Sequence, residues 1–185
     1  MENRTTVYNW GRILTEEQLK EIESAAETLN LGHSTVLSEG LLPPEELRVT
    51  NTGFFDKQRH PRIFELGDIL CRQANSAFHG FHIDSIGDAQ LAVYEGDKNA
   101  HYDWHTDIGW GDSSMYDRKI SAIVILSNPE EYEGGDVEFD NGEKYGSLER
   151  GTVITFPSYL RHKVHPVTEG IRVSLVFWVE GPRFR

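Results

Sequence analysis

The sequence predicts an α+β fold, namely a double-stranded β-helix (jelly-roll) barrel with N-terminal helices packed on the outside of one sheet. Apolar residues recur at helical spacing in two segments before residue 80, and short β-branched and aromatic runs broken by Gly, Asp, Asn and Pro follow from about residue 81. No helix has room between these runs, so we expect a mainly antiparallel sheet folded into two layers. A single domain is expected over residues 1–185, with a helical support region (1–80) and a jelly-roll core (81–185).

Two helices are expected in the support region, after a first strand at residues 6–10. Thr15 and Gln18 fit a capping box at the start of the first helix. The second helix is expected after Pro61, because proline is favoured at the first helical position. The apolar stripes that need a sheet to cover are Leu19, Ile22, Ala25, Ala26 and Leu29 in the first helix, and Ile63, Leu66, Leu70, Ala74 and Phe78 in the second.

The segment 34–58 shows little periodicity, and we expect a loop or short irregular strands that border a functional site. Its Phe54 and Phe55 are interpreted as core residues. The barrel strands are expected at residues 90–94, 120–126, 137–139, 152–156, 163–167 and 172–179.

The net charge limits the classes of partner that we expect for this protein. Lysine and arginine number 18 against 30 aspartates and glutamates, a formal net charge of −12. This charge repels polyanions, so nucleic acid is disfavoured as a partner, and the basic residues around 161–165 are interpreted as a site for a small anion.

No apolar run reaches membrane-spanning length and residues 1–5 do not resemble a signal peptide, so we expect no membrane contact and a cytoplasmic location. Cys71 is the only cysteine, is expected to be buried, and excludes an internal disulfide. Nothing here indicates an oligomeric state.

The motif His105-Thr106-Asp107 is the candidate metal site. In an extended segment, side chains two residues apart project from the same side, so His105 and Asp107 can reach one ion while Thr106 points away. A second histidine from a distant strand would complete one face of an octahedron and leave the other face open. We interpret His162 as that ligand.

A candidate anion clamp follows in the last strand. Arg172 comes directly after the turn 168–170, where its guanidinium could hold a carboxylate in a bidentate pair. Ser174 lies on the same face of the strand and could add a hydroxyl.

Four motifs in order over roughly residues 90–182 closely resemble the iron(II)- and 2-oxoglutarate-dependent dioxygenases, and most nearly the PKHD-type, prolyl-4-hydroxylase-like hydroxylases. They are Tyr-Glu-Gly at 94–96 with Tyr-Asp-Trp-His-Thr-Asp at 102–107, Glu-Gly-Gly-Asp at 133–136, the run from Phe156 to Ser174, and Phe-Trp at 177–178. The support region matches nothing that we can name beyond the helices that such enzymes carry.

The resemblance implies a role for each matching residue. His105, Asp107 and His162 would bind Fe(II), Arg172 would bind the distal carboxylate of 2-oxoglutarate, and Ser174 and Tyr94 would assist it, with Tyr102 as a second candidate. Dioxygen is the further co-substrate, and ascorbate could stimulate turnover. One departure is that Ile125 and Leu126 stand in the strand where some branches carry a clamping tyrosine, so the clamp would depend more on Arg172 and Ser174.

The implied reaction is hydroxylation of an unactivated C–H bond, on a prolyl or other amino-acid residue in a peptide or protein. Alternatives are a hydroxylase of a free amino acid or small metabolite, and a non-oxygenase metal-binding jelly-roll protein. A zinc or nickel hydrolase would use the same triad but would leave Arg172 and Ser174 unexplained. A nucleic-acid demethylase is disfavoured by the negative charge and by the lack of a second arginine after Arg172 in the last strand.

The remaining chemistry-bearing residues have more ordinary interpretations. His165 is expected at the surface, on the face opposite to His162, and His101 is disfavoured as a ligand. Gly134-Gly135 is interpreted as a tight turn, and Trp110 could line the substrate channel. Structural roles are expected for His60, His79 and His82, and core packing is expected for Trp104 and Trp178.

Overall fold

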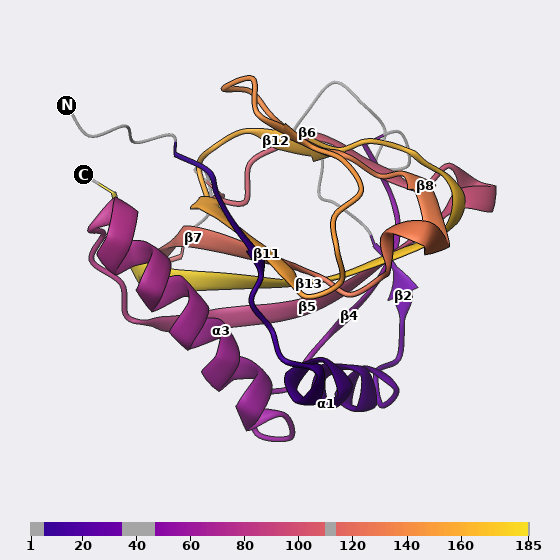
Figure 1. Cartoon of the computed structure of the whole chain (residues 1–185). Helices are drawn as coiled ribbons and strands as arrows, with labels where there is room; N and C mark the ends of the chain where they lie inside the picture. Colours follow the sequence, from indigo (N-terminus) through magenta and orange to yellow (C-terminus); the bar gives the residue numbers. More distant parts are fainter. Residues whose placement is uncertain (1–5, 35–46, 110–113, 185) are drawn as a thin grey trace.

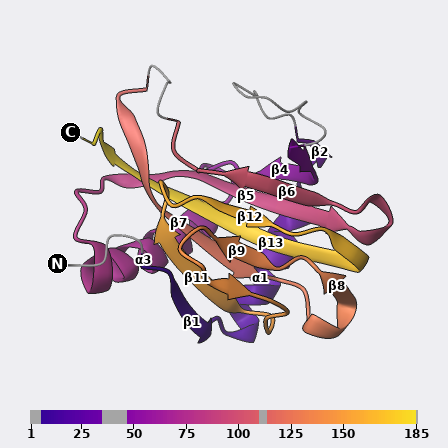
Figure 2. The ribbon, with the colours of Figure 1, turned by 90° about the horizontal axis from the view of Figure 1, so that it is seen from above.

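The computed structural model describes residues 6–34, 47–109 and 114–184, and two antiparallel sheets make up most of it. An eight-stranded sheet has the order β1-β11-β7-β13-β5-β4-β2, with β8 paired to β13, and a five-stranded sheet has the order β10-β9-β12-β6-β3. The smaller sheet lies over one face of the larger (Figures 1 and 2). The predicted α+β class with a two-layered antiparallel barrel is therefore confirmed.

The strands are short at the edges and long in the middle of the larger sheet. In the larger sheet they are β1 (Tyr8–Arg12), β11 (Thr152–Pro157), β7 (Tyr116–Ile125), β13 (Val167–Pro182), β5 (Ser85–Glu95), β4 (Asn51–Phe54), β2 (Gly32–His33) and β8 (Tyr132–Gly134). In the smaller sheet they are β10 (Lys144–Tyr145), β9 (Val137–Phe139), β12 (His162–Val164), β6 (His101–His105) and β3 (Arg48–Val49). Single 3₁₀ turns, η2 (Gly96–Lys98) and η3 (Pro129–Glu131), connect some of them.

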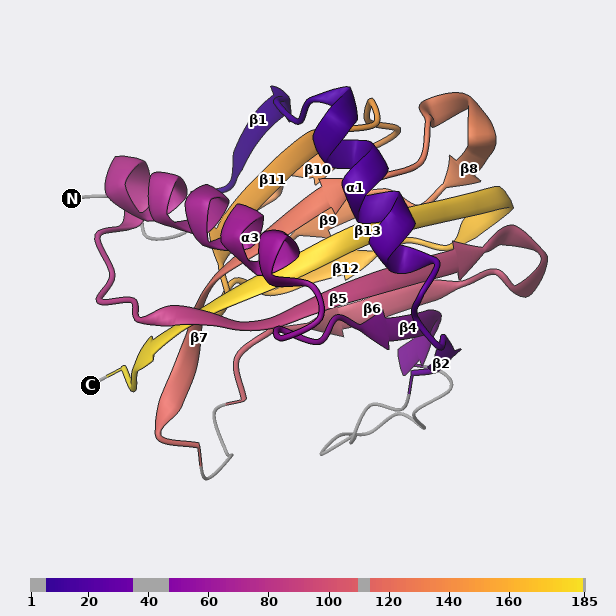
Figure 3. The ribbon, with the colours of Figure 1, turned by 90° about the horizontal axis from the view of Figure 1, so that it is seen from below.

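Helices α1 (Glu16–Ala26) and α3 (Pro61–Ala74) cover the outer face of the larger sheet (Figure 3). Helix α1 begins at the predicted capping box, in which the Thr15 hydroxyl accepts from the Gln18 N–H at 3.2 Å and the Gln18 side chain accepts from the Thr15 N–H at 2.9 Å. Helix α3 begins with Pro61 at its first turn and continues into a π-helical turn, η1 (Asn75–His79). None of the described helices is long and apolar enough to cross a membrane.

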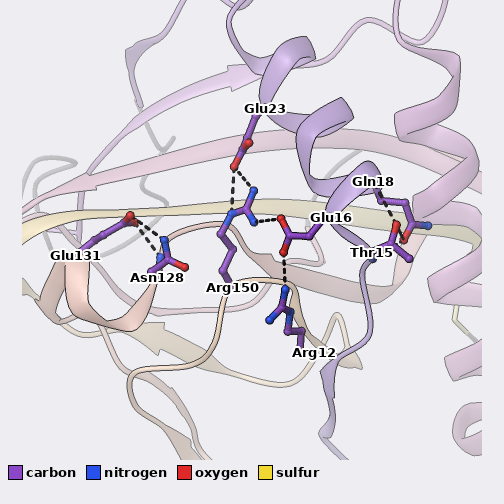
Figure 4. Close-up of polar contacts among 8 residues, drawn as sticks. All are labelled: Arg12, Thr15, Glu16, Gln18, Glu23, Asn128, Glu131 and Arg150. Atoms are coloured by element: carbon purple, nitrogen blue, oxygen red, sulfur yellow. Dashed lines mark hydrogen bonds and ion pairs between the residues drawn. The ribbon is translucent and has the colours of Figure 1, made fainter.

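Arg150 ties the loop before β11 to helix α1 (Figure 4). Its guanidinium donates to Glu16 at 3.0 Å and to Glu23 at 2.5 Å, two carboxylates that lie about two turns apart on one face of the helix. Arg12, at the end of β1, also pairs with Glu16. These contacts hold α1 on the edge of the sheet that carries β1 and β11, away from the metal-site candidates.

The larger sheet separates two hydrophobic cores. Its outer face packs against the helices through residues such as Leu175, Phe177 and Val179, all fully buried. Gly67 of α3 lies directly on Phe177, and a Cβ at position 67 would clash with that ring. The inner face packs against the smaller sheet through a second cluster that includes Phe139 and Phe156.

Several sequence predictions require correction. Residues 163–167 were expected as one strand, but β12 ends at Val164 and β13 begins at Val167, because Pro166 lacks the N–H that a continuing ladder needs. Phe55 is buried as expected, whereas Phe54 is 55% exposed. In contrast, the segment 34–58, expected as a loop or short irregular strands, contains the short strands β3 and β4 within its described part, in agreement with the prediction.

Candidate metal and co-substrate site

The two histidines of the predicted triad are brought together by strand pairing. In the antiparallel pair of β6 and β12, His105 lies directly opposite His162. Asp107 follows two residues beyond the end of β6, and its N–H donates to the Ser158 carbonyl at 2.9 Å. Asp107 Oδ1 is 3.7 Å from His105 Nε2, and its Oδ2 is 3.8 Å from His162 Nε2. One donor atom from each of the three residues therefore lies within 4.8 Å of the other two.

Backbone carbonyls fix which nitrogen each imidazole offers. His105 Nδ1 is 2.7 Å from the Asp103 carbonyl, and His162 Nδ1 is 3.0 Å from the Leu160 carbonyl. A carbonyl only accepts, so each Nδ1 carries a hydrogen, and Nε2 is the nitrogen that offers a lone pair when the ring is neutral. This is the arrangement in which a second partner orients a metal-binding histidine.

Burial and neighbouring charges set the protonation of the triad. Burial, followed by the adjacent His162, lowers the pKa of His105 to about 3, so its imidazole is neutral at pH 7. Burial would raise the pKa of Asp107, but the two imidazoles and the Ser121 hydroxyl outweigh it and hold this pKa below its usual value. The site thus presents a neutral imidazole at His105 and an ionised carboxylate at Asp107.

Two buried serines behind Asp107 were not predicted. Ser121, on β7, donates to Asp107 Oδ2 at 2.6 Å, and its hydroxyl is 2.9 Å from that of Ser158. Both serines are fully buried. A polar residue in the middle of the β-branched run of β7 was the available signal, because buried hydroxyls usually have a specific partner. Ser121 thus holds the Asp107 carboxylate directly, and Ser158 contacts the Ser121 hydroxyl.

Arg172 is the largest of the fully buried side chains, at 2% exposure. Its Nη1 donates to the Ser174 hydroxyl at 3.3 Å, and its guanidinium carbon lies 5.4 Å from the centre of the Tyr94 ring. Tyr94 is its direct cross-strand neighbour on β5. Within the described ranges no carboxylate forms an ion pair with it, and a buried cation without a counter-charge is costly. This end of the site therefore favours an anionic ligand.

The Gly134-Gly135 turn makes room for the Arg172 side chain. Both glycines have positive φ angles, 78° and 69°, in agreement with the predicted tight turn. A Cβ at Gly135 would lie 2.6 Å from Cδ of Arg172. The second glycine is thus needed to make room for the arginine stem as well as to form the turn.

The triad, Arg172, Ser174 and Tyr94 line one cavity of about 360 Å³ between the two sheets. Tyr102 is stacked on His105, with ring centres 3.4 Å apart and the planes inclined by 7°. Burial raises the pKa of Tyr102 to about 12, so its phenol stays protonated. The cavity contains both predicted tyrosines, but Tyr94 stands beside Arg172 whereas Tyr102 stands beside the triad.

The residues given structural interpretations lie outside the triad. His165 Nε2 bonds to Glu138 and His101 Nδ1 to the Asn99 carbonyl. Cys71 is fully buried, which also raises the pKa of its thiol. Trp104 is only partly buried and lies under the side chains of Arg161 and Lys163, so its interpretation as a core residue was wrong. Trp178 is buried but also lines the cavity, and Trp110 lies outside the described residues.

The donor set fits ferrous iron. Two imidazole nitrogens and one carboxylate oxygen, gathered on one side of a cavity, match the facial triad of non-haem Fe(II) sites, which leaves further coordination positions for other ligands. The free Nε2 lone pairs and the ionised Asp107 are in the states that binding requires. The buried, unpaired Arg172 adds a place for a dicarboxylate within the same cavity.

Solved structures with low sequence identity share the fold. A viral collagen prolyl hydroxylase from Paramecium Bursaria Chlorella virus-1 matches with a TM-score of 0.70 and 20% identity, covering 95% of this chain and 96% of that one. A prolyl hydroxylase from Trichoplax adhaerens, in complex with a hypoxia inducible factor peptide fragment, matches with a TM-score of 0.69 and 16% identity, covering 96% and 83%.

Sequence comparisons give the family. The chain is 40% identical over 99 residues to a PKHD-type hydroxylase of Synechococcus sp. (strain JA-2-3B'a(2-13)), covering 49% of this chain and 42% of that protein. It is 33% identical over 112 residues to one of Acidovorax ebreus (strain TPSY), covering 60% and 41%. The chain thus spans about two fifths of the length of these relatives. Residues 89–180, which include the triad and Arg172, match the model of the 2OG-Fe(II) oxygenase superfamily, and the chain belongs to that superfamily.

Proposed function

We propose that this protein is a 2-oxoglutarate- and Fe(II)-dependent dioxygenase that hydroxylates an unactivated C–H bond. His105, Asp107 and His162 bind the iron, and Arg172 with Ser174 binds the distal carboxylate of 2-oxoglutarate. The observation that carries this proposal is that three metal-binding donors within 4.8 Å of one another share a cavity with a buried arginine that has no ion pair among the described residues.

Fe(II) with bound 2-oxoglutarate supplies the oxidation of a C–H bond to an alcohol by dioxygen, with succinate and carbon dioxide as co-products. The chain's own residues bind, orient and exclude water. Arg172 and Ser174 fix one end of the co-substrate, and the inner core behind them keeps solvent out. Tyr94 is the better candidate for a further co-substrate contact than Tyr102, because it is the cross-strand neighbour of Arg172.

The proposed target is a prolyl or other amino-acid residue in a peptide or protein. Support comes from the relatives named PKHD-type hydroxylases and from the similarly folded prolyl hydroxylase with a bound peptide. Stimulation by ascorbate stays a prediction. A hydrolytic zinc site is the weaker alternative, because hydrolysis gives no role to the buried arginine.

The test is to purify the protein without oxygen, add Fe(II), and measure succinate formed from 2-oxoglutarate in air across a panel of peptides and free amino acids, with and without ascorbate. We expect succinate in excess of a no-protein control, together with a product that is heavier by one oxygen atom. Activity with Zn(II) in place of Fe(II), without use of 2-oxoglutarate, would contradict the proposal.

A further inference from the structure

An arginine of the smaller sheet also lines the cavity. Arg48, on β3, belongs to the part of the chain that the motifs do not cover. Its Nη2 donates to Oε1 of Gln90 at 3.0 Å. Gln90, on β5, is buried, with a relative exposure of 5%. Arg48 thus bridges the smaller and the larger sheet across the cavity that holds the triad.

Arg48 is held at a fixed place relative to the triad. Its guanidinium carbon lies 4.3 Å from the centre of the Tyr102 ring. That ring is in turn stacked on His105 at 3.4 Å. The Tyr102 ring therefore contacts both the Arg48 guanidinium and the imidazole of His105.

One donor atom of Arg48 lacks an acceptor. Its Nε is buried and has no hydrogen-bond partner. No ion pair to Arg48 is recorded within residues 6–34, 47–109 and 114–184. Arg118, which lines the same cavity, differs because it is paired with Asp88 at 2.6 Å and lies over the Trp178 ring. A buried guanidinium donor without an acceptor is costly, so a ligand acceptor is expected there.

Arg48 and Arg172 contact different positions along strand β5. Arg172 stands opposite Tyr94, whereas the partner of Arg48 is Gln90, four residues earlier on the same strand β5. At about 3.4 Å per residue the backbone positions of Gln90 and Tyr94 are roughly 14 Å apart, so the two arginines contact different parts of the cavity wall. The neighbouring cavity wall at this end comes from Thr52 and Phe54 on β4, and Phe54 is 55% exposed. This end faces the exterior.

We propose that Arg48 binds a carboxylate of the substrate, so that the enzyme prefers substrates with a free carboxylate close to the hydroxylated carbon. This inference rests on the proposed function, because it uses the same cavity. The two arginines divide the anionic groups between them, with Arg172 at the inner end for 2-oxoglutarate and Arg48 at the outer end for the substrate. A guanidinium is suited to this task because it holds a carboxylate by two parallel hydrogen bonds.

The carboxylate has two sources, and matched pairs distinguish them. The first set pairs standard L-amino acids with their primary amides, which removes the α-carboxylate charge. The second set pairs blocked peptides that carry Asp or Glu beside proline with the same peptides carrying Asn or Gln. We expect the wild-type kcat/KM to favour the acid in one of the two sets by roughly tenfold to a hundredfold, as for hydrogen bonds to charged groups.

Three variants test whether Arg48 causes the preference for the acid over the amide. Arg48→Gln should reduce the acid-to-amide ratio to about one, and Arg48→Lys should restore part of it, because the charge is retained while the bidentate geometry is lost. Arg62→Gln is the matched control, since Arg62 is an exposed arginine of α3 outside the cavity. Thermal unfolding of each variant shows whether the β3 to β5 bridge is also needed for the fold.

A binding measurement separates recognition from turnover. With Mn(II) and 2-oxoglutarate under nitrogen, calorimetric titration of the preferred acid should give a Kd that Arg48→Gln raises by the same factor as the ratio. An acid-to-amide ratio that Arg48→Gln leaves unchanged would overturn the inference, as would an effect of this variant on the 2-oxoglutarate requirement alone. Failure of the iron-loaded protein to form succinate under any condition contradicts the proposed function instead, and the titration still decides the role of Arg48.

Discussion

The two faces of strand β13 carry opposite kinds of side chain on one backbone. Leu175, Phe177 and Val179 point outward into the core beneath the helices. Arg172, Ser174 and Trp178 alternate with them and line the cavity. Both sets are buried. Close packing holds the outer set in place, whereas specific polar contacts hold the inner set. We therefore expect substitutions on the outer face to change stability and those on the inner face to change ligand binding.

The largest expected effect is that of Asp107→Ala on the inner side. Loss of the carboxylate removes one of three metal ligands, so 2-oxoglutarate turnover should fall by more than about a hundredfold, beyond the loss typical of residues that only support a ligand. The helix-facing core is untouched, so the thermal midpoint of the metal-free protein should change little. Undiminished turnover in a folded variant would remove Asp107 from the metal site.

Phe177→Ala is the matching change on the outer face. Phe177 is fully buried against Gly67 of α3, and its truncation should lower the free energy of unfolding by about 3–5 kcal/mol. Urea unfolding measures this loss. In the protein that remains folded, the KM for 2-oxoglutarate should stay near the wild-type value, and a large rise in KM would show that the two faces are not independent.

Arg172→Ala tests the co-substrate end of the inner face. Because the guanidinium is proposed to bind a carboxylate, the KM for 2-oxoglutarate should rise by roughly tenfold to a hundredfold. Iron content after anaerobic loading should be unchanged, since Arg172 is not among the metal-binding donors. An unchanged KM would mean that another group binds the distal carboxylate.

The smallest effect is expected for His165→Ala. His165 lies in the short connection between β12 and β13 and bonds to Glu138 at the surface of the smaller sheet. Its loss should change stability by no more than about 0.5 kcal/mol and leave iron binding intact. If this variant lost iron while His162→Ala kept it, the wrong histidine would have been assigned to the site.

The sequence predicted the outer face better than the inner one. The stripe of α3 with Ile63, Leu70 and Ala74 was visible because helical periodicity reports which face is buried. The triad was visible because His105 and Asp107 are close in sequence, and His162 was interpreted as the distant histidine that completes one face of an octahedron, in agreement with the family motifs. In contrast, periodicity treats Ser121 as one polar residue in an apolar strand, and only the folded structure shows its 2.6 Å contact with Asp107.

Long-range pairing accounts for the other omissions. Arg48 lines the cavity because β3 pairs with β6. No local sequence pattern predicts this pairing. The break of the strand at Pro166 separates His162 from the final strand and was missed because the flanking residues are good strand formers. The exposure of Phe54 likewise depends on its position at the cavity rather than on its own hydrophobicity.

The central claim is that the triad and Arg172 together form one site for Fe(II) and 2-oxoglutarate. Anaerobic titration of the protein with both ligands, followed by visible absorption, tests it most directly, because a 2-oxoglutarate that chelates protein-bound Fe(II) gives a charge-transfer band. We predict a band that saturates at one equivalent of iron, is lost in Asp107→Ala, and needs more 2-oxoglutarate in Arg172→Ala. A folded wild-type protein that binds iron but gives no such band with 2-oxoglutarate would contradict the account.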